Sequence, residues 1–190
     1  MAIELECKVR VESLATVRER LKAATGAEFV GRVLEENRLF DREDGSLRRA
    51  GCGLRVRSTR VVEGTAQSPT LTYKGPRAPG PFKRREEIEL QIADAATMGE
   101  ILHALGYSER VIFEKRRESW RLPPCRVELD ELPRLGTFVE VEGPSEAAVR
   151  EALTTLAIAD REPVSQTYVS MVVETGTADQ ALPIVLRFGP

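Results

Sequence analysis

The chain has 190 residues, with 28 Lys or Arg against 30 Asp or Glu and a formal net charge of −2. This length suits one domain with a sizeable core, and the near-zero net charge argues against a nucleic-acid binder or a protein of acidic membrane surfaces. Charged residues make up 31% of the chain, above the roughly 25% of an ordinary globular domain. The position of these charges is therefore the main question.

The three cysteines and the single histidine are scattered along the chain. Cys7, Cys52 and Cys125 lie far apart and form no CxxC pair. The chain has no apolar run that could cross a membrane, and it has carboxylates where an export signal needs apolar residues. We therefore expect a cytoplasmic protein with reduced thiols. The single histidine, His103, lies in an expected helix and is interpreted as a surface residue, because no nucleophile motif accompanies it.

Four segments show helical periodicity. The first follows Ser13, the second follows Asp94 and the third follows Ser145, and each of these residues suits a helix N-cap. A shorter fourth helix is predicted over about residues 165–174. The tail from Thr175 has no amphipathic pattern, so we expect a domain over residues 1–174 and a loosely attached tail over residues 175–190.

The segments between these helices alternate in polarity or carry β-branched residues, which predicts strands. Strands dominate, helices are inserted at intervals, and no change of composition marks a domain boundary. The fold class is therefore α+β, with one antiparallel sheet. The predicted strands cover residues 3–11, 53–60, 70–74, 83–92, 111–122, 126–132 and 137–142.

Charged residues recur at every second position of these strands, so they share one face of each strand. In the first strand, Glu4, Glu6 and Lys8 face one way, while Leu5 and Cys7 face the other. A solvent-exposed sheet face explains this pattern for any single strand. The full set is harder to explain in that way, because like charges at such spacing repel. The alternative is a closed barrel with a charged interior and apolar residues outside, covered by the helices.

The barrel interpretation gives a lining of seven basic and eight acidic side chains, with a net charge of −1. Clustered carboxylates suit hard divalent cations such as Mg²⁺, which prefer oxygen ligands. With two such ions the lining would become positive overall and would suit a polyanion such as a triphosphate. The basic members are Lys8, Arg55, Arg57, Lys74, Arg85, Lys115 and Arg117, and the acidic members are Glu4, Glu6, Glu87, Glu89, Glu128, Asp130, Glu140 and Glu142.

In their order along the chain, these residues resemble the CYTH family, also called triphosphate tunnel metalloenzymes. The match begins with Glu4-x-Glu6-x-Lys8, which is similar to the N-terminal ExExK signature of that family. It continues through residues 54–57, 71–76, 85–89, 115–117, 128–130 and 135–142. The resemblance implies an eight-stranded antiparallel tunnel, dependence on Mg²⁺ or Mn²⁺, a triphosphate substrate and, by family analogy alone, a homodimer.

The resemblance also implies roles for individual residues. Lys8, Glu4 and Glu6 would be catalytic, and Glu87, Glu89 and Glu128 would have supporting roles. Phosphate oxygens would be held by Lys8, Arg55, Arg57, Lys74, Arg85, Lys115 and Arg117. Metal ligands or their immediate supports would be Glu4, Glu6, Asp130, Glu140 and Glu142.

Within the family, the chain is most similar to the bacterial class IV adenylyl cyclase group, which implies conversion of ATP to cyclic AMP and pyrophosphate. The alternatives are a triphosphatase acting on thiamine triphosphate or inorganic tripolyphosphate, and a non-catalytic module that binds polyphosphate or phosphorylated ligands. Cyclase-like members often carry Asp-x-Tyr-Phe after the first helix, where this chain has Asn37-Arg38-Leu39-Phe40. We expect Asn37 and Phe40 to be strand and core residues.

Overall fold

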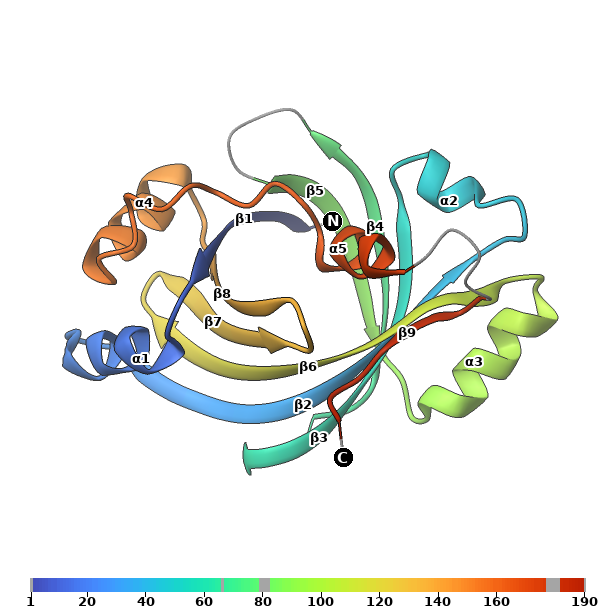
Figure 1. Cartoon of the computed structure of the whole chain (residues 1–190), viewed down its shortest axis with the longest axis horizontal. Helices are drawn as coiled ribbons and strands as arrows, with labels where there is room; N and C mark the ends of the chain where they lie inside the picture. Colours follow the sequence, from blue (N-terminus) through green and yellow to red (C-terminus); the bar gives the residue numbers. More distant parts are fainter. Residues whose placement is uncertain (1, 66, 79–82, 177–181, 190) are drawn as a thin grey trace.

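The structure, a computed structural model, describes residues 2–65, 67–78, 83–176 and 182–189. Within these ranges the chain forms nine strands and five helices, arranged around one sheet (Figure 1). Their bounds are β1 (Ala2–Val11), α1 (Leu14–Ala23), β2 (Glu28–Asp41), α2 (Ser46–Arg49), β3 (Gly53–Gly64), β4 (Thr70–Ala78), β5 (Lys83–Gln91), α3 (Ala95–Ala104), β6 (Ser108–Leu122), β7 (Cys125–Leu132), β8 (Gly136–Glu142), α4 (Glu146–Thr155), α5 (Tyr168–Thr175) and β9 (Ile184–Leu186).

Eight of the strands close into a ring. Their order is β2-β3-β4-β5-β1-β8-β7-β6, β6 pairs back with β2, and every pair in the ring is antiparallel. Figure 1 shows the strands curving around a common centre. A closed ring leaves no long unpaired strand edge. The predicted α+β fold, with an eight-stranded antiparallel tunnel, is confirmed.

The seven predicted strand segments correspond to β1 and β3–β8, and the eighth strand of the ring is β2. Alternation does not predict β2 well because charged residues occur on both of its faces. Glu35 and Glu36 are adjacent in sequence, and they point to opposite sides of the sheet. The strand is specified by its long antiparallel pairing with both β3 and β6.

The helices begin where their N-caps predict. The side chains of Ser13, Asp94 and Ser145 each accept a hydrogen bond from a backbone N–H in the first turn of α1, α3 and α4. Thr167 caps α5 in the same way, and the four-residue α2 lies between β2 and β3. Among the described helices, none has the length and apolar character needed to cross a membrane.

The main core lies outside the ring. Leu5, Cys7 and Val9 of β1 point outward and pack with apolar residues of β7 and β8 and with helices α1 and α4. These two helices lie beside β1 and β8 in Figure 1. Burial of this outer apolar face turns the alternate residues, Glu6 and Lys8, toward the inside of the ring.

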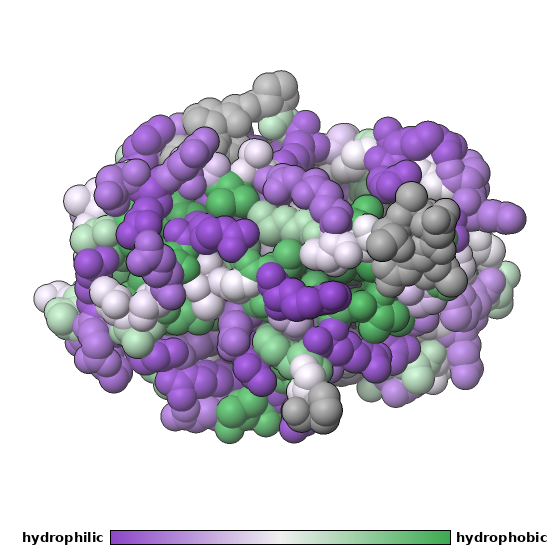
Figure 2. Space-filling view, in the orientation of Figure 1, coloured by the Kyte–Doolittle hydropathy of each residue, from purple (hydrophilic) through white to green (hydrophobic). Residues whose placement is uncertain are grey.

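Helix α5 is an exception to the prediction that the helices pack outside. At one end of the ring the inward-facing residues become apolar, as with Phe113 of β6, Leu132 of β7 and Phe138 of β8. Tyr168 and Val172 of α5 pack against this apolar end, and Figure 1 shows the helix in front of the opening. Figure 2, in the same orientation, shows hydrophobic atoms in the middle of a largely hydrophilic face. The charged lining therefore covers only part of the tunnel's length.

The prediction of a loosely attached tail is wrong for residues 184–188. Strand β9 pairs in parallel with β6, and its Leu186 is only 1% exposed. Arg187 Nη2 lies 2.8 Å from Glu36 Oε2, and the backbone N–H of Phe188 donates to Glu114. Three apolar residues in a row are too few to show a period, so the sequence pattern does not reveal this strand. The division at residues 174 and 175 stays a prediction.

Candidate functional site

The ring encloses a cavity of about 1490 Å³, which is lined by residues of all eight strands and of helices α2 and α5. Two of the fifteen predicted site residues need separate comment: Asp130 is fully buried, and the side chain of Glu4 lies outside the described part of the structure. The cavity is lined by the other thirteen: Glu6, Lys8, Arg55, Arg57, Lys74, Arg85, Glu87, Glu89, Lys115, Arg117, Glu128, Glu140 and Glu142.

Strand register explains how residues far apart in the sequence meet here. Lys8 is directly opposite Glu140, which in turn is opposite Glu128 on the next strand. Glu6 is opposite Glu142. Like charges at such close spacing are destabilising unless opposite charges or bound cations compensate them. The cations of neighbouring strands provide part of this compensation.

Arg117 connects the acidic side chains of three strands. Its Nε and Nη2 lie 2.7 and 2.6 Å from the two carboxylate oxygens of Asp130, and Nη2 is also 2.6 Å from Glu140 Oε2. Burial by itself would lower the pKa of Arg117, but Asp130, Glu128 and Glu35 raise it well above its ordinary value. Arg117 is therefore a permanent cation on the wall of the cavity.

Glu35 of β2 is a central ion of the site that the sequence interpretation missed. Its side chain is 2% exposed, and its oxygens lie 3.2 Å from Lys115 Nζ and 3.6 Å from Arg57 Nη1. Burial opposes ionisation, yet Lys115, Arg117 and Arg57 hold the pKa of this carboxyl far below its usual range. Glu35 thus fixes three of the predicted phosphate-binding cations around one buried negative charge.

Asn37 lies two residues further along the same face of β2. Its Nδ2 donates to Glu35 Oε2 at 3.3 Å, and its Oδ1 accepts from Arg55 Nη1 at 3.5 Å. Asn37 is therefore a buried strand residue, and Phe40 is a core residue packed with α3, as expected. Glu35 and Asn37 are polar residues at alternate positions of β2. This alternation is the sequence pattern that could have predicted β2 as a strand of the cavity lining.

Asp130, a predicted metal ligand or immediate support, is enclosed by side chains of β6 and α5. Besides Arg117, it is contacted by Lys115 Nζ at 3.4 Å and by the hydroxyl of Tyr168 at 2.9 Å. The side chain is 0% exposed. This geometry fits an immediate support better than a direct ligand, and the metal-binding role stays a prediction. The backbone of Glu4 lies opposite Arg85.

The three predicted supporting carboxylates each contact a cation of the wall. Glu87 Oε2 lies 2.7 Å from Lys74 Nζ, and Glu89 Oε2 lies 3.5 Å from Arg57 Nη2. Glu128 accepts a hydrogen bond from Ser119, and burial raises its pKa. These contacts hold long, flexible cationic side chains along the wall.

The carboxylates that line the cavity have the right chemistry for Mg²⁺ or Mn²⁺. Glu6, Glu140 and Glu142 offer hard oxygen donors on the adjacent strands β1 and β8. Among the side chains that the structure describes, no three such groups converge on one point. Mg²⁺ is usually held by one or two protein carboxylates together with waters and substrate phosphates. The residues present therefore fit a divalent ion that binds together with its phosphate ligand.

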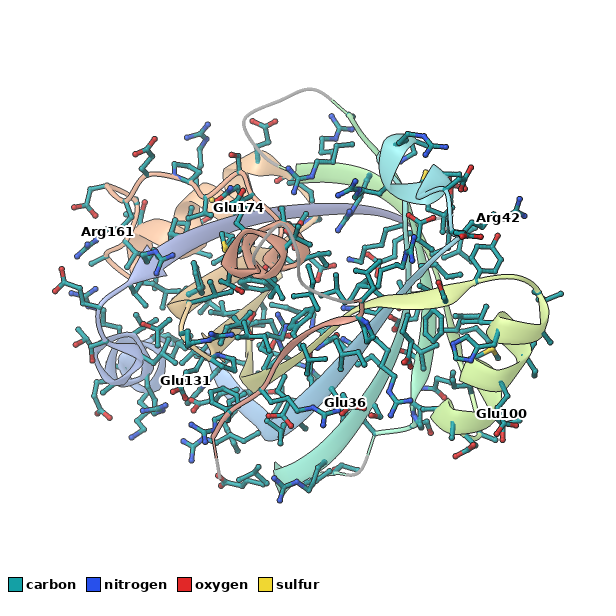
Figure 3. All side chains as sticks on the ribbon, turned by 45° about the vertical axis from the view of Figure 1, so that its right-hand side comes forward. Glu36, Arg42, Glu100, Glu131, Arg161 and Glu174 are labelled. Atoms are coloured by element: carbon teal, nitrogen blue, oxygen red, sulfur yellow. The ribbon has the colours of Figure 1, made fainter. Side chains whose placement is uncertain are left out.

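Most of the other described charged residues are exposed or half-buried, although Asp41 and Glu118 are buried. Figure 3 labels several of them, and Glu100 on α3 and Arg161 lie at opposite ends of the molecule. Exposed ions of this kind contribute little to stability. The high charged fraction of the chain therefore divides into a wet outer surface and a paired inner lining.

Comparison with known proteins agrees with this geometry. The family model described as the CYTH domain matches residues 2–167. A protein of Methanocaldococcus jannaschii, named as a candidate adenylate cyclase, is 33% identical over 140 residues, which cover 74% of this chain and 76% of the relative.

Solved structures show the same fold. A Pyrococcus horikoshii protein superposes with a TM-score of 0.76 and 25% identity, over 91% of this chain and 99% of its own. A Hippeastrum protein, named as a candidate adenylyl cyclase and described as having a dominant triphosphatase activity, gives a TM-score of 0.69 and 18% identity, over 93% of this chain and 98% of its own.

Proposed function

Because the chain belongs to the CYTH family, we propose that it is a divalent-metal-dependent enzyme that binds a triphosphate in its tunnel and cleaves it. The observation that carries this proposal is the convergence of cations and carboxylates from all eight strands of the ring on one cavity. A surface that only bound polyanions would have little use for so many carboxylates, since they repel phosphate.

The cationic side chains would bind the phosphate oxygens. Arg55 and Arg57 of β3 and Lys115 of β6 surround one region of the wall, where Glu35 orients two of them. Charge-assisted hydrogen bonds from these groups would align the triphosphate and stabilise the charge that develops on the oxygens in the transition state. The protein contributes mainly position and electrostatics, as is general for phosphoryl transfer.

The carboxylates of β1 and β8, namely Glu6, Glu140 and Glu142, would hold the ion. When bound, a divalent ion supplies Lewis-acid polarisation of the phosphate oxygens. Arg117, now paired with Glu140 at 2.6 Å, would be able to turn to a phosphate oxygen once that carboxylate has another partner. Lys8, opposite Glu140, would contact phosphate or assist activation of the nucleophile.

The first candidate reaction is cyclisation of ATP, in which the ribose 3′-hydroxyl attacks the α-phosphorus and pyrophosphate leaves. The name of the Methanocaldococcus relative supports it.

Hydrolysis of the terminal phosphate is the second candidate, and two features favour it. Asn37 and Leu39 replace residues typical of cyclase-like members. The three aromatic side chains in the described lining, Phe40, Phe113 and Tyr168, are only 2%, 4% and 8% exposed, so they offer little ring surface for stacking a base. The activity described for the Hippeastrum protein also supports this reaction.

A product assay distinguishes these reactions. The purified protein is incubated in turn with ATP, thiamine triphosphate and tripolyphosphate, each with Mg²⁺ or Mn²⁺, and cyclic AMP, pyrophosphate and phosphate are resolved. Cyclic AMP from ATP supports the cyclase, and phosphate without cyclic AMP supports the triphosphatase. Tight binding of tripolyphosphate without any product would identify a binding module and contradict the proposed catalysis.

Two variants of β3 test whether substrate binding depends on the lining of the tunnel. Arg57→Ala removes a cation of the wall and should weaken triphosphate binding, raising KM roughly tenfold or more. Arg60→Ala removes an exposed cation of the same strand and should leave KM unchanged. Equal KM values for the two variants would exclude the tunnel as the substrate site.

A further inference from the structure

We propose that Tyr168, on helix α5, is a positioning residue that holds both Lys8 and Asp130 in their working geometry. This inference rests on the proposed function, because it concerns how the tunnel prepares its groups for a triphosphate. Tyr168 lies 38 residues beyond Asp130 in the chain and belongs to none of the charged strand motifs.

The ring of Tyr168 covers the end of the Lys8 side chain. Lys8 Nζ lies 3.9 Å from the ring centroid, and the lysine is only 1% exposed. A cation over the face of an aromatic ring is attracted by the ring quadrupole, and this attraction is stronger where water is excluded. The ring therefore helps to fix the position of the ammonium group at the end of its four-carbon chain.

The hydroxyl of Tyr168 acts on a second group. It donates to Asp130 Oδ2 at 2.9 Å, and Asp130 in turn accepts from Arg117 and lies 3.4 Å from Lys115 Nζ. A residue that does not itself touch the bound ligand can orient, through a hydrogen bond, the residues that do. One side chain of α5 thus reaches a predicted catalytic lysine and, through Asp130, two predicted phosphate-binding cations.

Tyr168 is itself held firmly. Thr167 and Ser170 form a reciprocal capping box at the start of α5, directly beside Tyr168. The Tyr168 ring also packs edge-on against Phe138, with 5.3 Å between ring centroids. A support must be rigid to keep functional groups within a fraction of an ångström of their positions, and these contacts provide that rigidity.

Two substitutions separate the ring from the hydroxyl. Tyr168→Phe keeps the ring over Lys8 and removes the bond to Asp130, so KM for tripolyphosphate should rise about tenfold while kcat is retained. Tyr168→Leu removes both contacts, so KM should rise and kcat should also fall about 10- to 100-fold. Val172→Ala, on the same helix and in the same apolar cluster, is the matched control and should change neither constant more than about twofold.

A second readout does not depend on turnover. The chain has five lysines, so a carbon-13-labelled sample gives few lysine side-chain NMR signals, and Lys8→Arg assigns one of them. The ring current of Tyr168 should shift the terminal methylene protons of Lys8 upfield. We expect this shift in the wild type, in Tyr168→Phe and in Val172→Ala, and its loss in Tyr168→Leu.

The outcomes are distinct. A Tyr168→Leu variant with wild-type kcat, or a Lys8 signal that does not change, would overturn the positioning role. If Val172→Ala lost as much kcat as Tyr168→Leu, the loss would come from disturbed packing of α5 and not from Tyr168 itself. This result would also overturn the positioning role. A wild-type protein that converts none of the three triphosphates contradicts the proposed function instead, and the Lys8 signal still decides whether Tyr168 holds the lysine.

Discussion

Single residues in the tunnel are stable as ions only because they are arranged in pairs. Moving a charge out of water costs several kcal/mol, and an opposite charge at hydrogen-bonding distance must offset this cost. Glu35 and Asp130 are nearly or fully buried, and each is surrounded by cations of β6. Binding of a triphosphate and a divalent ion would exchange these internal partners for external ones.

Glu35→Gln should lower the free energy of unfolding by about 3 kcal/mol at pH 7, because it leaves buried cations without their shared carboxylate. The cations hold the pKa of Glu35 below its unfolded value of about 4.3. The stabilisation is therefore complete above that value and is lost as the pH falls toward the folded pKa. Urea unfolding of both proteins at several pH values measures the difference, which should shrink below about pH 4.

The matched control for this prediction is Glu36→Gln. Glu36 is the next residue of β2, faces outward and pairs with Arg38 and Arg187, whose side chains are 34% and 50% exposed. A partly exposed pair of this kind contributes at most about 1 kcal/mol. A Glu36→Gln effect as large as that of Glu35→Gln would show that burial in the tunnel is not the cause.

Glu140→Gln tests the predicted metal ligands. The amide keeps the shape of the side chain but removes a negative oxygen donor, so the Mg²⁺ concentration at half-maximal activity should rise at least tenfold. Glu131→Gln, on the exposed face of β7, should leave this concentration unchanged. An unchanged metal response in Glu140→Gln would remove this residue from the metal site.

Among the elements, β6 connects the most parts of the molecule. It pairs with β2 along one edge and with β7 and β9 along the other, and it carries Lys115 and Arg117 on its inner face. The C-terminal residues attach to this strand and so belong to the packed structure. Helix α5 also contacts β6, so this strand supports both the apolar end of the tunnel and the cationic residues of the lining.

Adjacent residues of β9 test the role of the C-terminal segment. Leu186 is 1% exposed and packs in the cluster with Met171 and Val172, whereas Val185 is 41% exposed. Leu186→Ala should cost about 3 kcal/mol, since truncation of a buried leucine leaves a cavity. Val185→Ala should cost less than about 1 kcal/mol. Chemical denaturation compares the two, and equal small effects would show that the tail is loosely attached.

For the whole molecule, the net charge of −2 averages two different surfaces. The outside is mixed and wet, while the inside holds nearly balanced charges around a cavity. A small net charge therefore argues against a general nucleic-acid binder, but it is compatible with a receptor for a small polyanion. Ring closure is what separates the two surfaces, because it gives the sheet an inside.

The proposed function predicts that saturating tripolyphosphate with Mg²⁺ stabilises the folded protein, because ligands that bind the ring and not the unfolded chain favour folding. At one hundred times the Kd the gain is about 2.7 kcal/mol, which corresponds to a rise of roughly 5–10 °C in Tm for a domain of this size. Differential scanning calorimetry measures this shift. Arg57→Ala should show a smaller shift at the same concentrations, and no shift in the wild type would contradict binding in the tunnel.

The charged faces of the strands and the starts of the main helices can be predicted from the sequence. Both are local properties: alternation at every second residue places Glu6 and Lys8 on one face, and a single side chain such as Ser13 caps a helix. The order of the charged motifs also predicted the family and its tunnel. These features can be predicted without knowing which segments of the chain lie side by side in the fold.

Completion of the site depends on tertiary contacts that the sequence pattern does not predict. Glu35 became a central ion because β2 lies between β3 and β6, and Tyr168 reached Lys8 because α5 lies across the end of the ring. Leu186 was buried by a strand of only three residues. Each of these results depends on contacts between segments far apart in the chain, and local polarity does not encode which distant segment a residue will meet.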